Sequence, residues 1–193
     1  MTDYYHKNFQ TYYQKTFCVD PSSFLIPLIK RLSQKAKILD LGCGSGRDLL
    51  WLKNHGFEPV GFEQSPGLAE LARKLSGCRV IKGNFEEFDF SFFSFDALIM
   101  IGSLVHVSHK DFPDIFERIT LSLCKKGYVL ITLKKGNGIK KSNDGRSFYL
   151  WQDNDLEQIF YKKNFKIIDF FIQSSIVSPD DTWLGYVLQK KAA

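Results

Sequence analysis

Strand-like and helix-like segments alternate along most of this chain, and this alternation constrains its fold more than any other feature. The expected strands are KILDL (37–41), EPVGFE (58–63), CRVIKG (78–83), FDALIMIG (95–102), YVLITLK (128–134), FKIIDFFIQ (165–173) and WLGYVLQK (183–190). The expected helices span 21–33, 47–56, 65–77, 111–127, where Gly127 ends the helix, and 153–164. Strands that alternate with helices predict a parallel sheet with helices on both faces.

The last two expected strands are joined by only the short segment SSIVSPDDT (174–182). A parallel crossover needs about a dozen residues or more, usually with a helix. These two strands are therefore expected to pair as an antiparallel hairpin. The prediction is an α/β fold with a seven-stranded, mostly parallel, doubly wound sheet whose last strand is antiparallel.

Composition fits one domain over residues 1–193, with 44% hydrophobic and 24% charged residues. A net charge of +5 is too small to indicate nucleic-acid binding by itself. The polar N-terminus has no signal-peptide core, and the apolar run ALIMIGSLV (97–105) is too short to cross a bilayer. Scattered cysteines indicate a reducing compartment. We expect a cytoplasmic protein with no membrane partner, as a monomer or homodimer.

The stretch ILDLGCGSGRDLL places three glycines, Gly42, Gly44 and Gly46, between the first expected strand and a helix. Ligands of open parallel sheets bind at the carboxyl ends of the strands. Bare N–H groups at a helix start favour a negatively charged ligand group. A tight turn without a ligand would also use glycines, but three at alternate positions favour a binding loop.

The spacing of these glycines distinguishes two kinds of ligand. A dinucleotide-binding loop reads G-x-G-x-x-G, whereas Arg47 occupies the third-glycine position of that pattern here. Asp40 precedes the first glycine by two residues, where a diphosphate gains nothing from a negative charge. A ligand with an amino group and a sulfonium would gain from it. A nicotinamide oxidoreductase is therefore disfavoured.

The run ILDLGCGSGRD resembles the glycine-rich motif of class I S-adenosylmethionine-dependent methyltransferases, whose fold is Rossmann-like, and the resemblance covers most of the chain. It implies S-adenosyl-L-methionine as cofactor and S-adenosyl-L-homocysteine as product. Glu63 matches the acid that binds both ribose hydroxyls, and KGNF matches the segment beside the adenine, although the family usually has aspartate where Asn84 stands. The cofactor-binding residues implied are Asp40, Gly42, Gly44, Ser45, Gly46, Arg47, Glu63, Gln64, Asn84, Phe85 and Ile101.

A closer similarity is to small bacterial members of that family. They carry a pattern like GRSFYLWQDNDL (145–156) and a tyrosine-rich N-terminus like TYYQKTFCVDPSSF (11–24). We therefore expect residues 1–34 to form a helical lid, with Tyr12 and Tyr13 over the positive sulfonium, which suits an aromatic face. An amphipathic helix that only packs on the core is the alternative.

The chemistry implied is an in-line displacement that moves the methyl group to a small-molecule acceptor and requires no metal. His106, in the loop after the fourth strand, is expected to act as a base, to orient the substrate, or merely to pack. Lysines between 125 and 146 together with Arg146 suggest an anionic acceptor gripped by Arg146, unless they belong to a solvated loop.

Two other function classes remain. Amino-group nucleic-acid methyltransferases often carry a D/N-P-P-Y-type motif after the fourth strand, where this chain reads IGSL (101–104). That reading is disfavoured, and no nucleic-acid partner is expected. A catalytically silent protein that binds S-adenosylmethionine and acts through a partner is the alternative to an enzyme.

Overall fold

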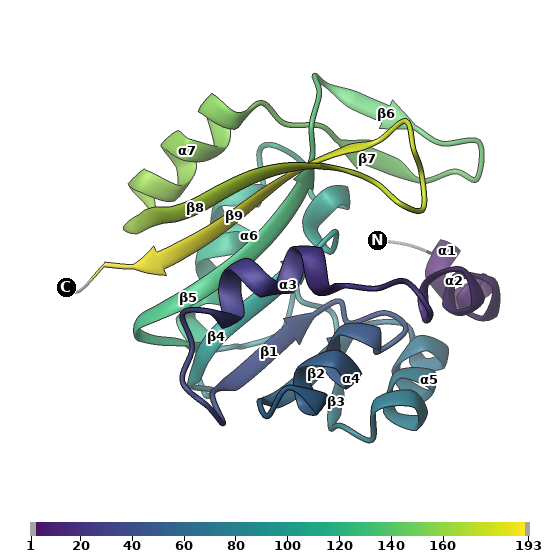
Figure 1. The fold of residues 1–193 in the computed structure, drawn as a ribbon. Coiled ribbons are helices and arrows are strands. Elements are labelled where there is room, and N and C mark those ends of the chain that lie inside the picture. Colours follow the sequence, from purple (N-terminus) through teal and green to yellow (C-terminus); the bar gives the residue numbers. More distant parts are fainter. Residues whose placement is uncertain (1–2, 192–193) are drawn as a thin grey trace.

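The structure is a computed structural model that describes residues 3–191, and one seven-stranded sheet forms its centre (Figure 1). The strand order is β3-β2-β1-β4-β5-β9-β8. Their bounds are β1 Lys37–Leu41, β2 Glu58–Glu63, β3 Val80–Lys82, β4 Phe95–Ile101, β5 Leu123–Lys134, β8 Phe165–Ser174 and β9 Thr182–Lys190. β9 runs antiparallel to both β5 and β8. The predicted fold class, including the reversed last strand, is confirmed.

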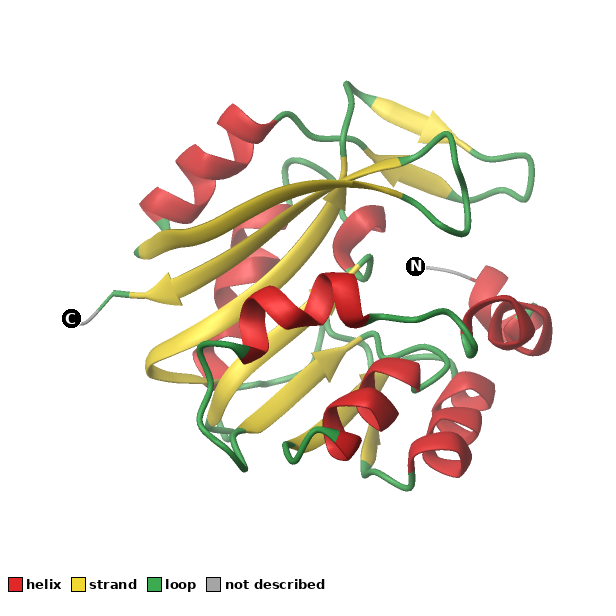
Figure 2. Cartoon of the chain, viewed as in Figure 1, coloured by secondary structure: helices red, strands yellow, loops and turns green. Residues whose placement is uncertain are grey.

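Helices cover both faces of this sheet (Figure 2). Their bounds are α3 Ser22–Ile29, α4 Arg47–Asn54, α5 Pro66–Ser76, α6 Phe112–Ile119 and α7 Asp153–Lys162, with short 3-10 turns η1 Leu104–His106 and η2 Thr120–Ser122. Leu25 and Leu28 of α3 and Leu52 of α4 pack on one face, against Ile38 of β1 among others. α6 and α7 pack on the other face.

Successive residues of a strand point to opposite faces, so a strand covered on both sides must be apolar throughout. Ile38 and Leu39 of β1 show this, because they belong to two different core clusters and are 0% and 1% exposed. This double burial explains why the strands were recognisable as continuous apolar runs in the sequence.

Two short helices precede the sheet, α1 Asp3–Lys7 and α2 Phe9–Thr16. They lie near α5, at the edge of the sheet toward which the β1 arrow points (Figure 1). The Phe9 ring packs on Gly67 of α5, where an added Cβ would come within 2.5 Å of it. Ser65 Oγ donates a hydrogen bond of 3.1 Å to the carbonyl of Tyr5. The N-terminal segment is thus anchored beside the glycine loop.

The prediction of a helix over 111–127 is wrong for the second half of this segment, because α6 ends at Ile119 and β5 begins at Leu123. Leu123 pairs with Phe95 of β4 and is 5% exposed in the core. Sheet hydrogen bonding and burial of this side chain outweigh the helical spacing of the segment. Gly127 packs against Leu123 inside β5 instead of ending a helix.

A two-stranded hairpin, β6 Ile139–Lys141 with β7 Ser147–Tyr149, was not expected from the sequence. Each strand has three residues, and all of β6 is exposed, so no alternating apolar pattern marks it. Within residues 3–191, no helix has both the length and the apolar character that a membrane span requires.

Candidate functional site

The glycine loop after β1 needs glycine both for its backbone conformation and for close contacts. Gly42, Gly44 and Gly46 have φ values of 69°, 52° and 81°, in the left-handed region that side chains disfavour. A Cβ would lie 2.7 Å from the Cβ of Ser103 at Gly42, and 3.3 Å from the ring of Tyr12 at Gly44. The loop is therefore closed in by the end of β4 and by α2.

Glu63 ends β2 directly beside this loop. The Gly44 N–H donates to its Oε2 at 2.9 Å, and the Ser65 N–H donates to its Oε1 at 2.8 Å. Burial raises the pKa of the carboxyl group, and these backbone hydrogen bonds oppose the rise. The side chain is 7% exposed, so the backbone fixes a buried acid at the carboxyl end of the sheet.

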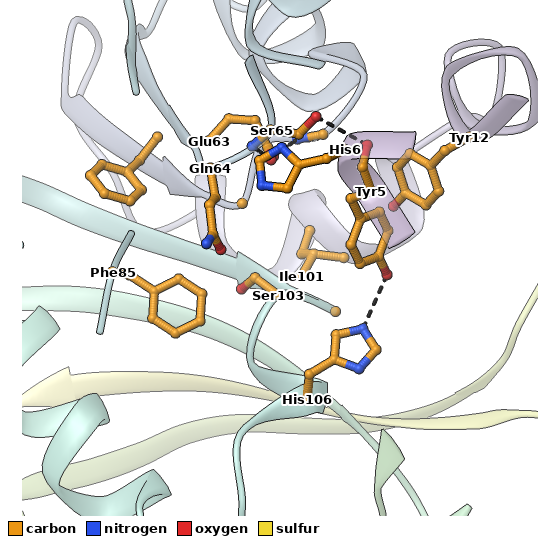
Figure 3. A pocket seen from close by; sticks show the side chains of 14 residues that line it. Tyr5, His6, Tyr12, Glu63, Gln64, Ser65, Phe85, Ile101, Ser103 and His106 are labelled. Atoms are coloured by element: carbon orange, nitrogen blue, oxygen red, sulfur yellow. Dashed lines mark hydrogen bonds between the residues drawn. The ribbon is translucent and has the colours of Figure 1, made fainter. Parts of the chain in front are cut away.

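Two cavities meet at this end of the sheet, and Figure 3 shows the smaller one. The small cavity, of about 70 Å³, is lined by Glu63, Gln64, Phe85, Ser103 and His106 among others. The large cavity, of about 610 Å³, extends past Arg47 to β5, β7 and the start of β9. Both are bounded by Tyr5, Tyr12, Gly42, Gly44, Ile101 and Gly102. These six residues form the boundary between the cavities.

Two buried polar atoms near the cavities have no hydrogen-bond partner among the described residues, Asp40 Oδ2 and Ser103 Oγ. Asp40 lies in β1 immediately before the glycine loop and is 2% exposed. Burial, followed by the charge of Asp48, raises the pKa of Asp40 well above its ordinary value. Buried polar atoms in proteins are nearly always paired, so both atoms indicate a place for polar ligand groups.

His106 lies in η1, and both of its ring nitrogens are engaged. Nδ1 is 2.6 Å from the carbonyl oxygen of Ser147, which can only accept, so Nδ1 carries the proton. Nε2 then accepts the hydrogen bond of 3.1 Å from the Tyr5 hydroxyl, drawn in Figure 3. Burial lowers the pKa of the imidazole. His106 is therefore held neutral, with its basic nitrogen directed at the N-terminal helices.

Arg146 lies in the wall of the large cavity, but its charge is already paired. Its guanidinium binds Asp144, with Nη2 at 2.6 Å from Oδ2, and holds the pKa of that carboxyl to about 2. It also lies over the Tyr4 ring at 4.2 Å and donates to the Tyr5 hydroxyl at 3.3 Å. Arg146 thus joins the β6–β7 hairpin to α1.

The structure brings most of the expected site residues together and leaves some apart. Ser45, Arg47, Ile101 and Tyr12 line the large cavity, and Gln64 and Phe85 line the small one. Four of the expected residues, Asp40, Gly46, Asn84 and Tyr13, line neither cavity. Gly46 packs on Ala72, Asn84 accepts a bond of 3.1 Å from the Glu86 N–H, and Tyr13 stacks on Phe17 at 5.0 Å.

Among the N-terminal tyrosines the sequence favoured Tyr12 and Tyr13 over Tyr5, and no pattern singled out Ser103, Phe148 or Trp183. The cluster of tyrosines near the N-terminus is the signal that could have found Tyr5, although Tyr5 lies in α1 and Tyr12 in α2, so no single helical face joins them. Their rings meet edge to face at 5.1 Å. Phe148 and Trp183 carry no such signal, since tertiary packing alone brings them to the cavity.

Comparison with known proteins gives one family. Residues 38–127 match the family model described as a methyltransferase domain. This segment contains the glycine loop, Glu63 and His106, and it runs from β1 to the middle of β5. A search of curated proteins finds no significant match.

Solved structures share the fold at low sequence identity. An S-adenosylmethionine-dependent methyltransferase from Methanosarcina mazei is 16% identical, with a TM-score of 0.75 over 86% of this chain and 98% of that one. The 1,6-didemethyltoxoflavin-N1-methyltransferase of Burkholderia thailandensis is 18% identical, with a TM-score of 0.75 over 97% and 84%. The magnesium protoporphyrin IX methyltransferase of Synechocystis is 12% identical, with a TM-score of 0.70 over 99% and 86%.

Proposed function

We propose that this chain, whose residues 38–127 match a methyltransferase domain, transfers the methyl group of S-adenosylmethionine to a small-molecule acceptor held in the large cavity. The observation that carries this proposal is the pair of cavities that meet at the end of β4, with α1 and α2 beside them. A cofactor that reaches from the small cavity across the shared boundary would leave the rest of the large cavity for a small acceptor. A macromolecular acceptor would need an open surface at the same point.

The residues around the glycine loop suit the groups of S-adenosylmethionine. Glu63, already oriented by two backbone N–H groups, offers carboxylate oxygens to the ribose hydroxyls. The unpartnered Asp40 Oδ2 suits the amino group, and the unpartnered Ser103 Oγ suits a polar edge of the base. Gly42 and Gly44 leave room for the ligand beside the backbone. When bound, the cofactor supplies a sulfonium-activated methyl carbon.

The protein's main contribution to methyl transfer is to hold donor and acceptor in line at close range. We place the transfer at the boundary between the cavities, beside Ile101 and Gly102 at the end of β4. The hydroxyl of Tyr5 lies at the same boundary and is bonded to His106. His106, neutral and proton-accepting at Nε2, is our candidate base for an acceptor that must lose a proton.

Of the segment 1–34 expected to form a lid, residues 1–2 lie outside the described part of the chain and α3 packs on the core, so we further propose that α1 and α2 act as the lid within a single domain. Tyr5 and Tyr12 face the cavities from α1 and α2, and Ser65 and Arg146 hold Tyr5 from two other parts of the chain. This arrangement excludes water from the place of transfer. Opening of these helices would admit the ligands.

Two relatives support a small-molecule acceptor by analogy. The Burkholderia thailandensis enzyme is bound to 1,6-didemethyltoxoflavin and S-adenosylhomocysteine, and the Synechocystis enzyme acts on magnesium protoporphyrin IX. Both acceptors are small compared with a protein or a nucleic acid. Their identity is not carried over to this chain.

The test is a methyl-transfer screen over metabolite classes, with formation of S-adenosylhomocysteine as the readout. We expect turnover of at least one small molecule, and a slower rate with His106→Gln at unchanged cofactor affinity. Cofactor binding without turnover of any metabolite, protein or nucleic acid would favour the catalytically silent alternative.

A further inference from the structure

The far wall of the large cavity holds a buried ion pair that the proposed function leaves unused. Lys134 at the end of β5 is 7% exposed, and its Nζ lies 2.5 Å from Oδ2 of Asp181, which is 8% exposed. Lys140, in β6, binds the other carboxylate oxygen of Asp181 at 2.8 Å. One carboxylate thus serves two ammonium groups from different parts of the chain.

The cations of this wall share their counter-charges. Arg146 is the third cation, and Asp144 is its partner. Lys134 and Lys140 share the one carboxylate of Asp181, while Asp180 acts on Lys140 without a direct contact, so Lys134 has only part of one counter-charge. Burial of Lys134 strengthens its electrostatic effect, because few water molecules screen it.

Aromatic rings surround the buried ammonium group. Lys134 Nζ lies 3.8 Å from the centroid of Phe148 and 5.6 Å from that of Trp183. Arg146 approaches the Phe148 ring as well, at 5.2 Å. Two cations therefore contact one ring, and the rings offer flat walls on which a planar ligand can stack.

The same wall reaches the proposed place of transfer. Trp183 packs against Gly102, where an added Cβ would lie 3.2 Å from its ring. Gly102 belongs to the boundary between the two cavities. A molecule between Phe148 and Trp183 would therefore have one end near Lys134 and the other near the end of β4.

From this geometry we propose that Lys134, oriented by Asp181, forms the anion-binding end of the acceptor subsite, and that the acceptor is a planar ring compound with a carboxylate. The ammonium group has three N–H donors, and Asp181 takes one of them. The carboxylate binds a remaining donor, and the ring lies between Phe148 and Trp183. The proposal rests on the proposed function only for the role of the bound molecule as methyl acceptor.

The binding test uses simple probes, since it does not depend on turnover. Binding of S-adenosylhomocysteine is measured first by calorimetry. Benzoate, benzamide, benzylamine and acetate are then titrated into the saturated protein, with ligand-observed NMR as the readout. We expect benzoate to bind about tenfold more tightly than benzamide, because a charged partner strengthens the hydrogen bond. Benzylamine and acetate should bind more weakly than benzoate, for lack of the charge and of the ring respectively.

Matched variants identify the group responsible. Lys134→Met should remove the preference for benzoate over benzamide, whereas Lys135→Met, the same change at the exposed neighbour, should keep it. Phe148→Leu should weaken benzoate and benzamide alike and leave their ratio unchanged. Affinity for S-adenosylhomocysteine, unchanged in all three variants, shows that each one is folded.

Three results would overturn the proposal: equal affinity for benzoate and benzamide, a preference that survives in Lys134→Met, or no binding of any probe. A failure of S-adenosylhomocysteine to bind contradicts the proposed function instead. The probe series is then run on the ligand-free protein, where it still decides whether Lys134 binds anions.

Discussion

At the scale of single residues, Glu63 is oriented by the backbone before any ligand is present. The N–H groups of Gly44 and Ser65 both donate to its carboxylate, so little conformational entropy remains to be lost on binding. An amide in its place would turn its NH₂ group toward one of these N–H donors.

Glu63→Gln should therefore lower the affinity for S-adenosylhomocysteine about tenfold or more, since charged hydrogen bonds contribute about 1.5–3 kcal/mol each. Calorimetry measures the change. Glu58→Gln, at the exposed opposite end of the same strand, is the control and should bind like the wild type. Equal affinity in both variants would show that Glu63 does not contact the ligand.

Gly46, at the start of α4, allows α4 to pack closely against Ala72 of α5. Its φ is +81°, and an added Cβ would lie 2.7 Å from the Cα of Ala72. Gly46→Ala should lower the free energy of unfolding by about 3 kcal/mol or more, because backbone strain and a clash add. Gly138→Ala is the matched control, since Gly138 has φ +69° and nothing within 4 Å.

Strain alone should reduce the stability of Gly138→Ala by about 1–2 kcal/mol. Urea unfolding of both variants gives the comparison. Similar losses in the two variants would mean that the α5 backbone moves away from Gly46 at little cost.

His106 should titrate below the ordinary histidine pKa of 6.5, because burial lowers its pKa. NMR titration of the imidazole gives the midpoint directly. The neutral form binds no proton at Nε2 and is the form able to act as a base. A methyl-transfer rate limited by His106 should therefore stay constant above this ordinary value and fall only at lower pH.

The pKa of His106 is lower in the folded protein than in the unfolded chain. The neutral ring therefore contributes stability that is fully present above the ordinary pKa of 6.5 and is lost as the pH falls through the lowered pKa of the folded protein. His106→Gln should remove this acidic loss of stability. A midpoint at or above the ordinary value would contradict the buried, neutral state of the ring.

At the scale of elements, α2 is held by the Phe9 ring on Gly67 of α5, and α1 is held by three contacts of Tyr5. The Tyr5 hydroxyl bonds His106, its carbonyl accepts from Ser65, and Arg146 reaches Tyr5 from the β6–β7 hairpin. The contacts of Tyr5 join the N-terminal helices to residues beside the cavities. We therefore expect ligand binding to stabilise these two helices.

Amide hydrogen exchange in residues 3–16 should slow when S-adenosylhomocysteine is added, since the ligand completes the surface beneath Tyr12. Exchange in α7, on the far part of the sheet, serves as the internal control and should not change. Tyr5→Phe should speed exchange in residues 3–16 of the free protein, because it loses the bond to His106. Identical exchange with and without ligand would argue against a lid.

Elements with strong local signals were predictable from the sequence, and those defined by tertiary contacts were not. Ser65 caps the start of α5 with a side chain that accepts from the Leu68 N–H, and Gly77 caps its end in the left-handed conformation, as cap chemistry predicts. The segment after Ile119 has helical spacing, yet pairing of Leu123 with β4 turns it into a strand. The β6–β7 hairpin is too short and too exposed to leave a pattern.

At the scale of the whole molecule, the succession of strands and one short connection were enough to predict the class of the sheet, although not the order of its strands. Alternation gave the parallel strands, and the length of 174–182 gave the reversed β9. The cofactor end of the site was equally predictable from the sequence, because Gly42, Gly44 and Glu63 lie at the ends of strands that meet at one edge of the sheet. The acceptor end was predictable only in part. The lysines between 125 and 146 indicated positive charge, but Lys134, Phe148 and the pair Asp181 and Trp183 come from three segments that only the folded chain brings together.

The most direct test of this account is a crystal structure of the protein with S-adenosylhomocysteine. We predict the ribose hydroxyls at Glu63, the amino acid portion at Gly42 and Gly44 with its amino group toward Asp40, and the sulfur at the boundary beside Gly102. The space between Phe148 and Trp183 should stay free for the acceptor. A ligand bound elsewhere, or one whose sulfur points away from this boundary, would contradict the account.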